Sequence, residues 1–136
     1  MFLVDTNVLS EATRASPSKS VIAWLGNQRA ITISVLSVFE LEYGIDRLTG
    51  VKRDRLTQWF EALLSSPGVE VVAVDAPIAR AAGRMKQSAE RSGRPRPLAD
   101  LLIAASAQTL GSVVVTRNTV DFEGLGVPLL NPFLGP

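Results

Sequence analysis

Residues 2–9 read Phe-Leu-Val-Asp-Thr-Asn-Val-Leu, an apolar run that meets an acid and two further polar residues. The run Phe2-Leu3-Val4 has the length and composition of a buried strand. The side chains of Asp5, Thr6 and Asn7 are of the kind that cap helices, so we expect a helix to begin near Val8. A buried strand that passes directly into a helix is the unit from which parallel α/β sheets are built.

The same alternation continues along the chain. Further strands are predicted at residues 30–34, 69–74, 112–116 and 127–130, the last of them short. Helices are predicted from Pro17-Ser18, from a cap at Ser37, over 52–64, from Asp75 to near Gly93 and over 97–110, with at most one helical turn in 118–126. This order predicts an α/β fold with a short parallel sheet between two layers of helices. The 136 residues suit one domain, residues 1–136.

The composition restricts the chemistry that the chain can perform. It has no His and no Cys, and its formal net charge is +1. Disulfides, thiol nucleophiles and imidazole zinc sites are thereby excluded. Carboxylates are the remaining strong metal ligands, and they favour the hard cations Mg²⁺ and Mn²⁺. The chain shows neither a signal peptide at its start nor an apolar run that could span a bilayer, so we expect a cytoplasmic protein.

Four acids are candidates for a shared site: Asp5, Glu40, Asp100 and Asp121. Asp5 directly follows the first predicted strand and Asp121 follows the fourth by a few residues, so both are expected at the carboxyl edge of the sheet, where ligands bind. Glu40 and Asp100 are each expected in the first turn of a helix, Glu40 as part of a Ser37-x-x-Glu capping box. Helices that follow strands begin at this same edge.

Each acid also has a purely structural interpretation. Asp5 could only cap a helix, Glu40 could only complete a capping box, Asp100 could only favour the helix dipole, and Asp121 could be an ordinary loop acid. The neighbours of Asp100 favour function, because residues 98–105 read Leu-Ala-Asp-Leu-Leu-Ile-Ala-Ala. A carboxylate buried among such residues must be paired, protonated or metal-bound.

Four segments resemble, in order and spacing, the acidic motifs of PIN-domain proteins. They are residues 3–11 around Asp5, 37–44 around Glu40, 98–107 around Asp100 and 115–122 around Asp121. The closest resemblance is to the VapC-type toxins of toxin–antitoxin pairs, including their FitB-like branch. The resemblance covers the whole chain and implies a PIN-like three-layer α/β/α domain.

The resemblance also implies an activity, that of an endoribonuclease leaving a 5′-phosphate and a 3′-hydroxyl. Its cofactor would be Mg²⁺, with Mn²⁺ as a substitute, because four crowded carboxylates repel one another until a divalent cation neutralises them. The residues that match the catalytic and metal-binding acids of the family are Asp5, Glu40, Asp100 and Asp121. Those that match the bracing polar positions are Asn7, Thr116 and Asn118, whereas Glu42 is a weaker candidate.

A basic stretch precedes the Asp100 motif and consists of Arg84, Lys86, Arg91, Arg94 and Arg96, relieved only by Glu90. We predict that its four arginines contribute to RNA binding, because the last two lie a few residues before Asp100. The alternative is a solvated helix face with its exit loop, which would contain the same residues.

Two protein partners are predicted as well. The resemblance implies an antitoxin as partner, and the negative charge of four carboxylates predicts that this partner inserts an Arg or Lys among them. It would lie along a groove, for which the candidates are Trp24, Leu25, Leu41 and Ile45, unless these residues are simply core. A homodimer is expected because helix 52–64 carries more apolar residues than one buried stripe requires, namely Leu56, Trp59, Phe60, Leu63 and Leu64.

Three other interpretations remain open at this point. A receiver domain of a response regulator also places an Asp beside Mg²⁺, but it needs an acidic pair after the first strand and a Lys after a late one, where this chain has Asp5 alone and Arg117. A non-catalytic interaction module would use the acids only to bind a partner. A nuclease that processes RNA or DNA outside any toxin pair would share all four motifs.

Overall fold

The sheet at the centre of the molecule is wholly parallel. The structure, a computed structural model, describes residues 1–135. Five strands pair in the order β3-β2-β1-β4-β5, with β1 (Phe2–Val4) between β2 (Ile31–Ser34) and β4 (Val113–Val115). The outer strands are β3 (Val69–Val72) and the short β5 (Leu129–Leu130). Because all strands run the same way, their carboxyl ends share one edge.

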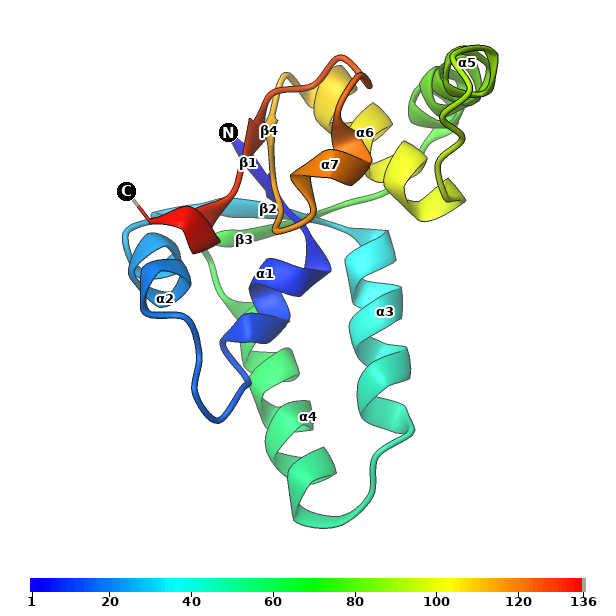
Figure 1. Ribbon diagram of the computed structural model, residues 1–136. Helices are drawn as coiled ribbons and strands as arrows, with labels where there is room; N and C mark the ends of the chain where they lie inside the picture. Colours follow the sequence, from blue (N-terminus) through cyan, green and yellow to red (C-terminus); the bar gives the residue numbers. More distant parts are fainter. Residues whose placement is uncertain (136) are drawn as a thin grey trace.

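Helices cover both faces of this sheet (Figure 1). One face carries α1 (Thr6–Glu11), α2 (Lys19–Gly26), α3 (Val35–Asp46) and α4 (Gly50–Ser65). The other carries α5 (Ala76–Arg91), α6 (Leu98–Leu110) and the single turn α7 (Thr119–Phe122). A 3₁₀ turn, Pro132–Leu134, follows β5. The predicted three-layer α/β/α architecture is therefore confirmed.

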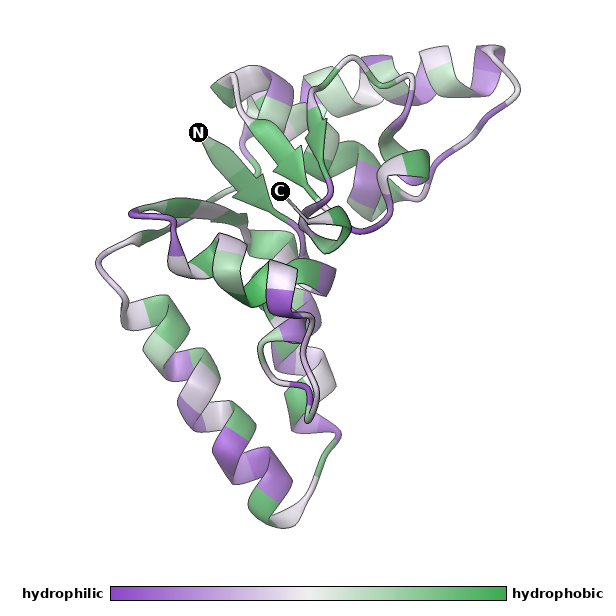
Figure 2. Ribbon diagram, turned by 60° about the vertical axis from the view of Figure 1, so that its left-hand side comes forward, coloured by the Kyte–Doolittle hydropathy of each residue, from purple (hydrophilic) through white to green (hydrophobic). Residues whose placement is uncertain are grey.

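Two separate cores result from the alternation of side chains along the strands. Leu3 and Val114 point to the α5–α6 face, whereas their neighbours Val4 and Val115 point to the α1–α4 face. All four are at most 1% exposed, as expected for strands covered on both sides. Figure 2 shows hydrophobic colouring along these strands and mixed colouring along the long α4.

One predicted helix start is wrong. Helix α3 is capped by Ser34 rather than Ser37, because the last residue of β2 keeps an extended backbone while its Oγ accepts the N–H of Leu36 at 3.1 Å. The helix thus leaves the strand without a loop. As a consequence Glu40 is not part of a capping box and lies in the second turn, and Ser37 is fully buried.

The surfaces predicted for partners also need correction. On α4, Phe60 is buried, and Leu56, Trp59, Leu63 and Leu64 pack partly buried against the core, so most of the area of these predicted residues is used within the fold. Leu41 and Ile45 are likewise core residues and cannot line a groove. Two large apolar side chains of α3 are well exposed instead, Phe39 at 68% and Tyr43 at 62%. Within residues 1–135, no helix has the length and apolar character needed to cross a membrane.

Candidate metal-binding site

The candidate site lies at the carboxyl edge of the two central strands. Strands β1 and β4 pair with Val4 opposite Val115, so the residues that follow them, Asp5 and Thr116, are neighbours. The backbone N–H of Asp5 extends this pairing by donating to the carbonyl of Val115 at 2.9 Å. Sequence order alone puts these residues 111 positions apart, and the parallel pairing brings them together.

Both carboxylate oxygens of Asp5 are held by donors. Oδ1 accepts the backbone N–H of Thr6 at 2.8 Å, which makes Asp5 the N-cap of α1. Oδ2 accepts the hydroxyl of Thr116 at 2.9 Å and the side-chain amide of Asn7 at 3.2 Å. The structural interpretation of Asp5 as a cap is thus correct for one oxygen, and the other is held by the side chains of Thr116 and Asn7.

The charge of Asp5 is nevertheless disfavoured. Burial raises the pKa of this carboxyl, the three hydrogen bonds lower it without reversing the shift, and the negative charge of Asp121 nearby raises it further. Thr116 itself is fully buried, and its hydroxyl oxygen also accepts the backbone N–H of Asn118 at 3.1 Å. The hydrogen bonds around Asp5 therefore fix its carboxylate in place but do not fully compensate its negative charge.

Glu40 reaches the same place from α3. Its Oε1 lies 3.0 Å from the hydroxyl of Thr6, which also lies 2.9 Å from the hydroxyl of Ser37. Since the Thr6 hydroxyl has one proton to give, it donates to the carboxylate of Glu40 while Ser37 donates to Thr6. Sequence reasoning missed both hydroxyl residues as parts of the site. Their positions, beside Asp5 and three residues before Glu40, were the available signal.

Asp100 stands in the first turn of α6 and is half-buried. Its pKa is raised to about 6 by burial first, then by the charges of Asp5, Asp121 and Glu40, against which Arg96 lowers it. All four predicted acids thus interact electrostatically at this one carboxyl. No hydrogen bond to its side chain is formed by any of residues 1–135.

Asp121 is placed less directly. Its charge raises the pKa of both Asp5 and Asp100, so it lies close to them. Its side chain is exposed in α7, and it does not line the hollow that the other three acids share. The main chain at Asp121 is fixed, since its N–H donates to the carbonyl of Asn118 and its carbonyl accepts Nε of Arg96 at 2.8 Å.

A hollow of about 300 Å³ collects most of the predicted residues. Three acids line it, Asp5, Glu40 and Asp100, together with Thr6, Asn7, Ser10, Ala99, Ile103 and Asn118. Thr116 lies beneath it, bonded to Asp5. A larger hollow of about 410 Å³ lies between α5, α6 and residues 123–126, but it contains only one acid, Glu123.

The donor set fits a hard divalent cation by chemistry and by charge. Carboxylate, hydroxyl and amide oxygens are the ligands that Mg²⁺ and Mn²⁺ prefer. The raised pKa of Asp5 and of Asp100 indicates negative charge without sufficient compensation. In the positions that residues 1–135 occupy, no three carboxylates already form a ready-made metal site.

The basic stretch divides into two parts. Arg84 and Arg91 are exposed on α5, and the side chain of neither forms a hydrogen bond or ion pair with another of residues 1–135. Arg94 and Arg96 instead donate to backbone carbonyls, Arg94 to that of Val120 and Arg96 to those of Asp121, Glu123 and Arg94. Arginines predicted to meet RNA are thus used in part to hold the protein itself.

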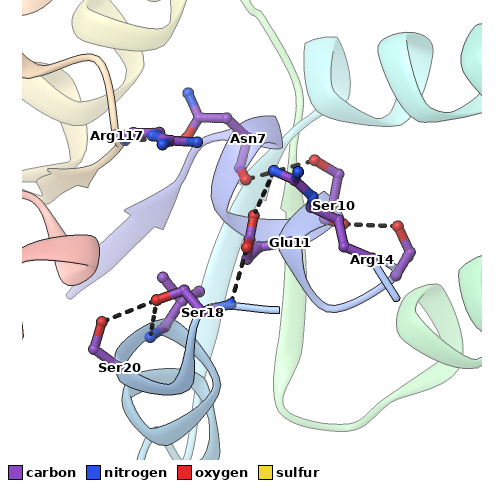
Figure 3. A network of polar contacts seen from close by, with 9 residues as sticks. Asn7, Ser10, Glu11, Arg14, Ser18, Ser20 and Arg117 are labelled. Carbon is purple, nitrogen blue, oxygen red and sulfur yellow. Dashed lines mark hydrogen bonds and ion pairs between the residues drawn. The ribbon is translucent and has the colours of Figure 1, made fainter. Parts of the chain in front are cut away.

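A fifth acid lies close in sequence but apart in role (Figure 3). Glu11 is 5% exposed, and its Oε1 accepts the N–H of Ser18 at 2.9 Å while Oε2 lies 3.6 Å from Nη1 of Arg14. It therefore ties α1 to the start of α2. Asn7, one turn earlier, faces the site, where its Oδ1 accepts the N–H of Arg117 at 3.1 Å.

Comparison with known proteins gives consistent matches over nearly the whole chain. Residues 2–126 match the PIN domain family. The chain is 34% identical to a VapC ribonuclease of Sinorhizobium fredii, over 98% of each protein. It is 32% identical to Toxin FitB of Neisseria gonorrhoeae, over 98% of this chain and 99% of the toxin. The crystal structure of FitAcB from Neisseria gonorrhoeae superposes with a TM-score of 0.87 at 32% identity, covering 98% of this chain and 99% of that one.

Proposed function

The chain belongs to the PIN-domain family, and from this premise we propose that it is a metal-dependent endoribonuclease that acts as the toxin of a toxin–antitoxin pair. One observation carries the proposal: Asp5, Glu40 and Asp100 come from separate elements to line one hollow, with Asp121 close enough to raise the pKa of two of them. The names of two relatives, a VapC ribonuclease and a toxin, support RNA as the substrate and poisoning of a cell as the outcome.

The cofactor we propose is Mg²⁺, with Mn²⁺ as a substitute. Asp5, Asp100 and Asp121 would hold it, and Glu40 would bind directly or through water. When bound, such an ion would polarise the phosphate and offset charge on the leaving oxygen. Its binding would also lower the free energy of the ionised site, because it removes the repulsion among the four acids.

The residues of the chain itself fix the geometry before any ligand arrives. Asn7 and Thr116 hold Oδ2 of Asp5, so this carboxylate keeps its direction in the free protein. Thr6 holds Oε1 of Glu40 from the same short helix. Asp100 carries its proton up to about pH 6 in the metal-free protein, and above that pH it is ionised and ready to bind a cation. Such preorganised polar groups lower the cost of reaching the reactive arrangement.

RNA would reach this site across the exposed side of α5 and its exit loop. Arg84 and Arg91 have the exposure and freedom needed for contacts with phosphates, and Arg94 is exposed as well. A single-stranded region suits a hollow at the end of a sheet, because its phosphates can enter without a second strand. The proposed reaction is hydrolysis that leaves a 5′-phosphate and a 3′-hydroxyl.

The partner we propose is an antitoxin that inserts a cationic side chain among the acids. An Arg is the economical choice, since its planar fork can bridge two carboxylates. Such a cation would compete with the metal, so excess Mg²⁺ should weaken the complex. We also propose a homodimer, for which the exposed Phe39 and Tyr43 of α3 are better candidates than α4.

The proposal is tested by incubating the purified chain with end-labelled single-stranded RNA in Mg²⁺, Mn²⁺ or a chelator. We expect cleavage in either metal, none in the chelator, and loss of at least about a hundredfold in Asp5→Asn. Asp54→Asn, which changes an exposed acid on α4, is the matched control and should cleave like wild type. Cleavage that persists in the chelator or in Asp5→Asn would contradict the proposal.

A further inference from the structure

The loop between α5 and α6 forms an unusual contact with α7. Arg96 Nε donates to the carbonyl of Asp121 at 2.8 Å, its Nη2 donates to the carbonyl of Glu123 at 2.6 Å, and its Nη1 donates to the carbonyl of Arg94. Arg94 adds a bond from its own Nη2 to the carbonyl of Val120 at 3.1 Å. In Figure 1, α7 lies against α6, close to where this loop arrives.

This contact supplies hydrogen-bond donors that the short helix α7 lacks. A helix of four residues cannot stabilise itself, and its last carbonyls have no partners within the helix. The N-cap, Asn118, makes no side-chain capping bond. The buried ring of Phe122 anchors one side of the turn, and the guanidinium of Arg96 satisfies the carbonyls on the other.

The sequence around Arg96 prepares it for this task. Arg94 and Arg96 alternate with Pro95 and Pro97, and a residue before proline is restricted to extended backbone. The backbone that carries both arginines is therefore stiff before they bind, so less entropy is lost on forming the contact. Arg96 is half-buried, and three of its five N–H groups already point to the protein, which leaves little of the guanidinium for an RNA phosphate.

The structure assigns Arg96 as a positioning residue that holds the main chain at Asp121 and so keeps this acid beside Asp5 and Asp100. The inference deepens the proposed function and rests on it for the role of Asp121. It differs from the prediction drawn from sequence, in which Arg96 binds RNA. A phosphate contact would act on the affinity for RNA, whereas a positioning residue acts on the metal site and on turnover.

The test compares Arg96→Met with Arg55→Met, which removes an exposed arginine of α4 whose side chain has no hydrogen bond or ion pair within residues 1–135. Three quantities are measured: amide hydrogen exchange of residues 119–125, affinity for Mn²⁺ alone by calorimetry, and kcat and KM on single-stranded RNA. In Arg96→Met we expect exchange to be at least about tenfold faster, Mn²⁺ affinity and kcat to fall about tenfold, and KM to stay unchanged. Arg55→Met should leave exchange, Mn²⁺ affinity and kcat as in wild type.

A conservative variant keeps the test informative if Arg96→Met fails to fold. Lys at this position can donate to one carbonyl but cannot span three, so Arg96→Lys should fall between wild type and Arg96→Met in all three quantities. If both variants kept wild-type exchange and Mn²⁺ affinity, the inference would be overturned.

Two further results would also overturn it, a third would separate it from the proposed function, and a fourth would overturn both. A raised KM with flatter salt dependence and unchanged kcat would make Arg96 a phosphate contact. Faster exchange with unchanged Mn²⁺ affinity and kcat would mean that Arg96 only connects the α5–α6 loop to α7 and does not position Asp121. A wild-type chain that bound Mn²⁺ but cleaved no RNA would sink the proposed function alone, since exchange and calorimetry still decide the role of Arg96. A wild-type chain that bound no Mn²⁺ would overturn both.

Discussion

The acids that follow β1 and β4 are held in opposite ways. The carboxylate of Asp5 is fixed by the N–H of Thr6, the hydroxyl of Thr116 and the amide of Asn7. The carboxylate of Asp121 is exposed and receives no hydrogen bond from any of residues 1–135, although its main chain is tied to Arg96. One acid is therefore rigid at the side chain and the other only at the backbone.

This difference separates two tasks that a cation site must perform. A ligand whose direction is fixed in advance defines where the ion sits, and its bracing partners influence affinity almost as strongly as the ligand does. A ligand with a free side chain can adjust to the ion, to a phosphate or to a cation from another protein. We infer that Asp5 defines the site and that Asp121 adapts to its occupant.

The largest effect is therefore expected from neutralising the rigid acid. Asp5→Asn should weaken Mn²⁺ binding at least about a hundredfold, whereas Asp121→Asn should weaken it about tenfold, because other ligands can compensate for the adjustable one. Calorimetry with Mn²⁺ alone measures both. Equal losses in the two variants would show that the difference in bracing has no consequence for binding.

The next effect concerns Thr116, the residue whose hydroxyl holds Asp5. Thr116→Val keeps the shape of the side chain but removes the hydroxyl that donates to Asp5 and accepts from Asn118. We expect Mn²⁺ affinity and cleavage to fall about tenfold, and the free energy of unfolding to fall by about 1 kcal/mol because the N–H of Asn118 loses its acceptor and Asp5 loses a donor. Thr116→Ser retains the hydroxyl and is the control, so a loss in Thr116→Ser as large as in Thr116→Val would point to packing instead.

The fold was predictable because short strands of unbroken apolar residues alternate with helices. Phe2–Val4 and Val113–Val115 carry this pattern without ambiguity, and the family inferred from the four acidic motifs is confirmed. The start of α3 was not predictable, because Ser34 and Ser37 are both acceptable caps and only the end of β2 decides between them. Which apolar helix face is exposed, that of α3 or α4, likewise depends on packing between elements distant in sequence.

The sequence predicted several of the residues that line the hollow, namely Asp5, Asn7, Glu40, Asp100 and Asn118, but not their contacts. Placing Asp5 beside Thr116 required only the order of parallel strands, and the structure brings them together. The bond between Thr6 and Glu40 joins positions 34 residues apart, and nothing in local sequence announces it. Arg96 shows the same limit, since a basic residue before an acidic motif suggests phosphate, whereas three backbone carbonyls turn out to be its partners.

A smaller effect tests the energetic cost of ionising Asp100, whose half-buried carboxylate lies among the other acids. The pKa of Asp100 rises from an ordinary value of 3.8 to about 6, so between these values the folded protein binds more protons than the unfolded chain. Stability without metal should therefore fall as pH rises from about 4 to 6 and remain lower above that range. Asp100→Asn stays neutral, and in a chelator it should be more stable than wild type by about 1 kcal/mol at pH 7.5, after discounting for a half-exposed group, and little different at pH 4.

Thermal unfolding at the two pH values measures this difference. Asp54→Asn is again the control, since an exposed acid on α4 should show no comparable dependence on pH. A variant Asp100→Asn that lost stability at pH 7.5 in the chelator would mean that the carboxylate makes a favourable contact in the metal-free protein, contrary to the uncompensated charge described above.

The smallest effect is expected from loosening Glu40, whose side chain is held less firmly than that of Asp5 and more firmly than that of Asp121. It is exposed like Asp121, yet a side-chain hydroxyl holds it as one holds Asp5. Thr6→Val removes that hydroxyl and leaves Glu40 free, but the backbone N–H of residue 6 still caps onto Asp5. An exposed hydrogen bond to a charged group contributes about 0.5–1 kcal/mol, so cleavage should fall only about threefold, with Mn²⁺ affinity reduced by no more than that factor. Thr6→Ser should restore the wild-type values. A loss in Thr6→Val as large as that in Thr116→Val would show that Glu40 is as firmly required as Asp5, and the division into one rigid and several adjustable acids would have to be abandoned.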